Sequence, residues 1–113
     1  AHQMGQAKSV MKLLPVIDTI ERAIANVPVE LADNAWAKGV AGLNKQLDKQ
    51  LKDLGLEKID AKPGTPFNPE LHQAIQFDEE AEGEKEVIAE ELRAGYTLDG
   101  VVIRDAMVKV TRQ

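Results

Sequence analysis

The spacing of apolar residues changes once along this chain, at Gly55, and this change restricts the fold more than any other feature of the sequence. Before Gly55, apolar residues recur every three or four positions, which is the spacing of a helix that buries one face. After Gly55, short apolar runs alternate with polar residues and are separated by turn-forming residues, as in strands. The sequence therefore predicts an α+β chain, with a helical hairpin over residues 8–56 and a small antiparallel β domain over residues 57–113.

The helical half contains two apolar stripes, and the first, over residues 10–27, includes Pro15. Because a proline inside a helix removes one backbone hydrogen bond and clashes with the preceding turn, we expect a kink there or a helix that continues an upstream segment. The second stripe follows Asp33 or Asn34, either of which can cap a helix. It ends at Gly55, since glycine readily adopts the left-handed conformation that follows many helices.

Two helices of this length cannot cover both of their stripes by packing on each other, whereas two hairpins from two chains can form a four-helix bundle. We therefore expect a homodimer. The expected core of this dimeric bundle consists of Leu13, Ile17, Ile20, Ile24, Trp36, Val40, Leu43, Leu47 and Leu54. A monomeric hairpin packed on the β domain is the alternative interpretation.

Two segments of the β half have a recognisable local pattern. Asp99 and Gly100 lie between apolar runs and suit a two-residue hairpin turn. The acidic residues 77–86 are expected to form a solvated hairpin loop around Gly83, because their spacing differs from that of a calcium-binding loop.

Composition argues against several classes of partner. The net charge of −5 and the absence of a dense basic patch disfavour nucleic acid. The chain has no cysteine, which excludes disulfides and cysteine-bound zinc. No apolar run is long enough to span a membrane and no signal peptide is visible, so we expect a cytoplasmic protein without membrane contact.

Catalytic chemistry is poorly represented in the sequence. His72 lacks the second histidine at helical spacing that a zinc protease requires, and no glycine-rich phosphate loop is present. The acidic residues lie in a loop too open to shift their pKa values. We therefore expect no enzyme activity, no metal and no cofactor. His72 is expected to bond backbone groups beside Pro66 and Pro69 instead.

The segments FNPELHQAI, residues 67–75, and GYTLDGVVIRDAMVKV, residues 95–110, resemble the signature region of the GrpE family, the nucleotide exchange factors of DnaK-type chaperones. The segment LLPVIDTIERAI, residues 13–24, is similar to the first short helix of that family. The resemblance implies a dimer whose β domain binds the ATPase domain of the chaperone and promotes ADP release by stabilising an open cleft. It also implies that the chain lacks the disordered N-terminus and most of the long helix of GrpE proteins.

The same resemblance implies which residues face the chaperone, namely Leu92, Val101, Arg104 and Val110. Val101 replaces an arginine that is frequent in the family, and Asp105 stands where a proline or a small residue is common. Two alternatives remain for single residues: Arg104 can pair with the acidic loop, and Leu92 and Val110 can belong to the core. For the whole chain, the alternative function is a dimeric adaptor that binds another protein or a peptide through its β domain.

Overall fold

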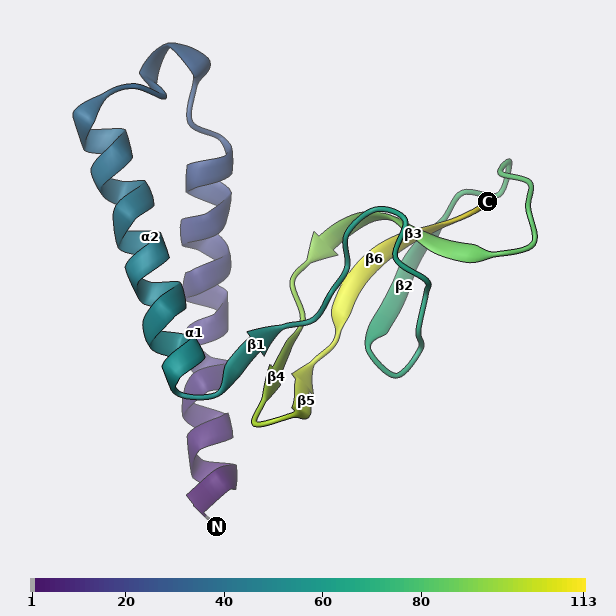
Figure 1. Cartoon of the computed structure of the whole chain (residues 1–113), viewed down its shortest axis with the longest axis horizontal. Helices are drawn as coiled ribbons and strands as arrows, with labels where there is room; N and C mark the ends of the chain where they lie inside the picture. The colour runs from purple at the N-terminus through teal and green to yellow at the C-terminus, as the bar shows by residue number, and fades with distance from the viewer. Residues whose placement is uncertain (1) are drawn as a thin grey trace. The chain divides into compact units, whose positions relative to one another are not determined.

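In the computed structural model (Figure 1), the backbone is described for residues 2–113 and the side chains for residues 5–113. The chain divides into two compact units, Ala1–Gly55 and Leu56–Gln113. The first contains the helices α1 (His2–Ala25) and α2 (Ala35–Asp53), joined through a short 3-10 helix at Val29–Leu31, and the second contains six strands. The α+β class expected from the sequence is therefore confirmed.

Local signals account for the bounds of the helices. α1 continues through Pro15, in agreement with a helix that extends upstream of the apolar stripe. α2 is capped by Asn34, whose side chain accepts a hydrogen bond from the backbone N–H of Trp36 at 2.8 Å. Beyond the end of α2, Gly55 has a φ of 97°, the left-handed conformation that glycine adopts at little cost.

The large apolar side chains of the helical unit differ in burial. α1 and α2 pack on each other, and the buried side chains are Val10, Leu14, Ile17 and Leu51. The half-buried members of the expected bundle core are Ile20, Ile24, Val40 and Leu47. Its other members, apart from the buried Ile17, are exposed within one chain: Leu13, Trp36, Leu43 and Leu54. Leu14 is buried in place of Leu13 because it lies four residues after Val10 and three before Ile17, on the face toward α2.

The β unit is built from two three-stranded sheets. In the first sheet, β4 (Tyr96–Leu98) pairs antiparallel with β1 (Leu56–Lys58) and with β5 (Val101–Arg104). In the second sheet, β6 (Ala106–Arg112) lies between β2 (His72–Phe77) and β3 (Glu86–Arg93). The chain passes from one sheet to the other at Asp105, which is exposed between β5 and β6.

The expectation of a purely antiparallel β domain is wrong in one strand pair. β6 is antiparallel to β3 but parallel to β2. Because β6 separates β2 from β3, the acidic segment that joins these two strands crosses the sheet and is not a hairpin loop. The alternation of apolar residues along the sequence does not reveal this strand order, because it indicates which segments form strands but not which strands pair with each other.

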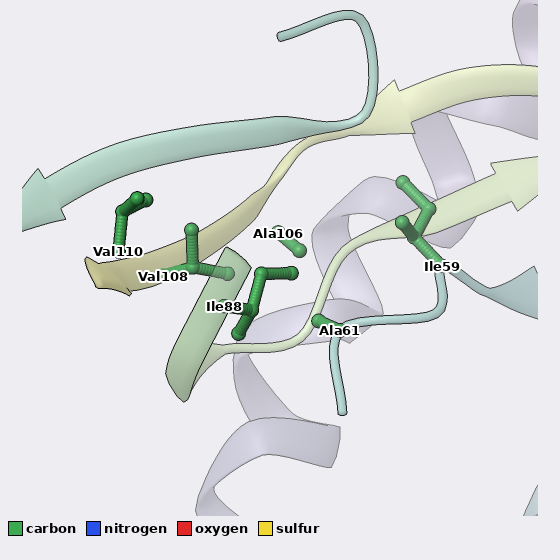
Figure 2. Close-up of a cluster of buried hydrophobic side chains, with 6 residues drawn as sticks. All are labelled: Ile59, Ala61, Ile88, Ala106, Val108 and Val110. Atoms are coloured by element: carbon green, nitrogen blue, oxygen red, sulfur yellow. The ribbon is translucent and has the colours of Figure 1, made fainter. Parts of the chain in front are cut away.

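The core of the β unit gathers side chains from three separate segments. Figure 2 shows the six buried residues of this cluster, which are Ile59, Ala61, Ile88, Ala106, Val108 and Val110. The three β6 residues are two positions apart, so the pleat of the strand directs all of them to the same face. The segment that follows β1 supplies Ile59 and Ala61, and this contact closes one side of the second sheet.

Two glycines allow close backbone geometry in the β unit. Asp99 and Gly100 have φ values of 50° and 83° and join Leu98 to Val101, which confirms the expected two-residue hairpin turn. Gly95 is required for a different reason, because a Cβ atom at this position would collide with the backbone of Ala106.

Candidate partner-binding surface

His72 is buried, and its ring forms hydrogen bonds with the backbone of two other segments, at Asn68 and at Asp60. The N–H of Asn68 donates to its Nδ1 at 3.0 Å, and its Nε2 lies 2.7 Å from the carbonyl oxygen of Asp60. Since an N–H can only donate, Nδ1 must be the acceptor, and Nε2 therefore carries the proton that it donates to Asp60. Both ring nitrogens are occupied by backbone groups. This agrees with the structural role expected for His72 beside the two prolines.

Arg104 lies at the end of β5, and its guanidinium contacts Ala94, between β3 and β4, and Tyr96, the first residue of β4. Nε and Nη2 both donate to the carbonyl oxygen of Ala94, at 3.0 and 2.6 Å. The guanidinium carbon also lies 5.3 Å from the centre of the Tyr96 ring, within cation–π range. Arg104 thus holds the segment between β3 and β4. The sequence did not identify Ala94 and Tyr96 as its partners, although all three lie within or beside the GY…IR signature.

Leu92 and Val101 offer apolar side chains at the surface of the β unit. Leu92 is 41% exposed and coincides with a register shift of β3 between Glu91 and Arg93, which interrupts the regular pairing with β6. Val101 is 65% exposed and directly follows the turn at Gly100. The Ala94 contact links Arg104 to the backbone two residues after Leu92.

Val110 requires a correction. It is only 1% exposed and belongs to the core cluster of the β unit, because the alternation of β6 places it on the same face as Ala106 and Val108. Its side chain is therefore a packing residue, and the expectation that it lies on a partner-facing surface is not supported. The alternative assignment of Val110 to the core is the correct one.

Two further observations concern other kinds of site. Among the side chains of residues 5–113, His and acidic groups nowhere gather in sets of three or more that could hold a metal ion. Over residues 2–113, neither α1 nor α2 combines the length and the apolarity that crossing a membrane requires.

The two units thus define a small α+β protein with exposed apolar side chains on both its helices and its sheets. The model of the GrpE family matches residues 1–112. The chain is similar to the protein GrpE of Lachnoclostridium phytofermentans, with 37% identity over 108 residues that cover 96% of this chain and 48% of that protein. It is also similar to the protein GrpE of Teredinibacter turnerae, with 40% identity over 113 residues that cover 99% of this chain and 59% of that protein. With the protein GrpE of Halalkalibacterium halodurans it shares 43% identity over 101 residues, which cover 89% of this chain and 52% of that protein.

The chain therefore belongs to the GrpE family. It spans about half the length of the curated relatives that it matches. GrpE proteins are co-chaperones and not enzymes, and this membership agrees with the lack of a catalytic group expected from the sequence.

Proposed function

We propose that this chain is a nucleotide exchange co-chaperone whose β unit binds the ATPase domain of a DnaK-type chaperone in the cytoplasm. The observation that carries the proposal is the pairing of β2 with β6, which unites the signature segments 67–75 and 95–110 in one β unit. Membership of the GrpE family supports the same conclusion.

The proposed mechanism is thermodynamic linkage and requires no catalytic group. A partner that binds the open form of the nucleotide cleft better than the closed form shifts the chaperone toward the open form. It weakens ADP binding by the same factor by which ADP weakens binding of the partner. A 100-fold effect requires only about 2.7 kcal/mol of differential binding free energy.

The proposed contact surface centres on the exposed side chains of Leu92 and Val101. Arg104, which was expected to contact the chaperone directly, supports this surface indirectly. Because two of its nitrogens already donate to Ala94 and its guanidinium lies over Tyr96, its main role is to position the segment that follows Leu92. Val110 contributes only through the core on which this surface rests.

We further propose that the helical unit forms the homodimer, as half of a four-helix bundle. Large apolar side chains remain uncovered on both helices, and Trp36 and Leu43 are 77% and 65% exposed. A second hairpin packed on this face would bury them, together with Leu13 and Leu54. Each fully buried side chain of this kind contributes about 1.5–3 kcal/mol, and a twofold axis doubles every contact.

One observation favours the adaptor as a second candidate function. β5 is an edge strand of its sheet, and it begins with the exposed Val101. An extended peptide could add to this edge through backbone hydrogen bonds. Nucleotide distinguishes the two candidates, because ATP should displace an exchange factor from the chaperone, whereas an adaptor should be indifferent to it.

Stopped-flow release of a fluorescent ADP analogue from a DnaK-type chaperone tests the proposal. Acceleration that saturates with the concentration of this chain is the expected result. A chain that binds the nucleotide-free ATPase domain without accelerating release would show that binding and opening are separate functions. A chain that does not bind this domain would exclude the proposed function and favour the adaptor.

A further inference from the structure

Two large apolar side chains of β2 are exposed, on a strand that carries none of the residues assigned to the chaperone surface. β2 is an edge strand of its sheet, and its residues Ile75 and Phe77 are both exposed. Phe77 ends the strand and is 56% exposed. The phenylalanine ring is large and entirely apolar, so at this exposure it offers a surface on which a ligand can pack.

A pocket of about 290 Å³ opens beside Phe77. It is formed by the end of β2, the start of the acidic segment, the first residue of β3 and the last residues of β6. Its exposed apolar surface comes from Phe77 and the half-buried Ala81, and its carboxylates come from Asp78, Glu79 and Glu86, while the buried Val110 lies at its base. Thr111 and Arg112 complete the lining. An aromatic ring beside several carboxylates is suited to a cationic side chain with an apolar stem.

The charge around this pocket is mainly negative, although its lining also includes Arg112, which stands opposite Glu86 in the sheet. Residues 78–86 contain six acidic residues and one lysine. Asp78 accepts a hydrogen bond from Thr111 at 3.3 Å. Across the described side chains, the carboxylates of Glu79 and Glu86 make no hydrogen bond or ion pair, so their charges are available to a ligand.

The backbone that carries these carboxylates is held in place by β6 and the residue after it. The N–H of Asp78 donates to Val110 at 2.9 Å, and the N–H groups of Glu84 and Lys85 both donate to Gln113 at 3.1 Å. Gln113 in turn donates to Lys85 at 2.9 Å. Figure 1 shows this segment beside the C-terminus, within the β unit. A fixed backbone lowers the entropic cost of binding a ligand.

We infer that this surface, formed by Ile75, Phe77 and the pocket, binds an extended basic peptide in which arginine or lysine alternates with apolar residues. The cationic head of one side chain lies among Asp78, Glu79 and Glu86, and its stem lies on the ring of Phe77. Neighbouring apolar residues of the peptide cover Ile75. The occupant is a peptide with positive charge, because the carboxylates would repel an acidic one. This inference is independent of the proposed exchange activity.

Fluorescence anisotropy with a short fluorescein-labelled peptide of alternating arginine and leucine tests the inference without any chaperone. The matched peptide carries citrulline, which preserves the shape of arginine and removes its charge. We expect the arginine peptide to bind about tenfold more tightly at low salt, and this preference to shrink as ionic strength rises. Equal binding of the two peptides would overturn the inference.

Two sets of variants locate the site. Phe77→Ala, and the pair Glu79→Gln with Glu86→Gln, should each weaken binding of the arginine peptide by about five- to tenfold. The matched control is Glu30→Gln with Glu57→Gln, which removes the same charge at exposed positions that do not line the pocket. A control pair that weakens binding equally would overturn the inference, since the peptide would then sense only net charge. Amide shifts of the ¹⁵N-labelled chain confined to residues 75–81, 86 and 110–112 would support it.

Discussion

The guanidinium of Arg104 donates twice to the carbonyl oxygen of Ala94, and this contact joins the end of β5 to the segment that leads from β3 into β4. Arg104→Lys keeps the charge but cannot reproduce the planar fork or its stacking on Tyr96. We expect the β unit to lose about 1.5–3 kcal/mol of unfolding free energy, the usual value of a hydrogen bond to a charged group.

Urea denaturation monitored separately in the two units tests this expectation. The fluorescence of Tyr96, the single tyrosine, reports on the β unit, and the fluorescence of Trp36, the single tryptophan, reports on the helical unit. Arg112→Lys serves as the control, because Arg112 is exposed. Equal stability of the Arg104 variant and the control would show that the Ala94 contact is energetically neutral.

Val101→Arg tests the proposed chaperone surface by introducing the arginine that the resemblance to the GrpE family implies at this position. Val101 is 65% exposed, so the longer side chain fits without disturbing the core. We expect affinity for the ATPase domain to increase by about five- to tenfold, as for one charge-assisted bond. Titration calorimetry measures the change. Thr97→Arg, on the neighbouring strand β4, is the control, and an equal gain there would indicate general charge attraction.

Leu43→Glu tests the proposed dimer. It places a charge on the uncovered apolar face of α2 twice per dimer, and we expect the dimer dissociation constant to increase by at least about 100-fold. Sedimentation equilibrium gives the dissociation constants. Lys45→Glu introduces the same residue on the other side of the helix and should leave the dimer intact. The proposal fails if the unmodified chain is monomeric at micromolar concentration.

His72→Ala tests whether the imidazole is structural. The variant leaves the N–H of Asn68 and the carbonyl of Asp60 without their partners, and each lost bond at a buried site costs about 1–3 kcal/mol. For the two bonds together, we expect the β unit to lose about 2–6 kcal/mol, measured by thermal unfolding, with Gln73→Ala as the exposed control. A folded variant that has lost nucleotide exchange altogether would point to a functional role for the ring.

The same change at two glycines should have opposite effects. Gly95→Ala forces a Cβ atom into the backbone of Ala106, and we expect it to destabilise the β unit by about 1–3 kcal/mol or more. Gly42→Ala meets no atom within 4 Å in the middle of α2, and we expect it to stabilise the helix by about 0.5–1 kcal/mol. Calorimetric unfolding of both variants gives the comparison. Destabilisation by Gly42→Ala would reveal a close neighbour from another chain.

Local patterns in the sequence were sufficient for the elements and several of their ends. The cap at Asn34, the end of α2 before Gly55 and the turn at Asp99 and Gly100 each depend on residues within a few positions of one another. The family was also apparent from residues 67–75 and 95–110, because side chains in a fixed order are a property of the sequence itself.

Tertiary structure decided the relations between distant segments. Alternation within β2 and β6 is the same for parallel and antiparallel pairing, so only the folded chain shows that these strands are parallel. It also shows that Val110 belongs to the core, that Arg104 bonds Ala94, and that Phe77 borders a pocket between the acidic segment and the end of β6. The sequence by itself thus determined the elements, the local turns and the family, whereas long-range packing decided which side chains meet and which remain at the surface. The physical reason is that these contacts depend on how separate segments fill a shared volume.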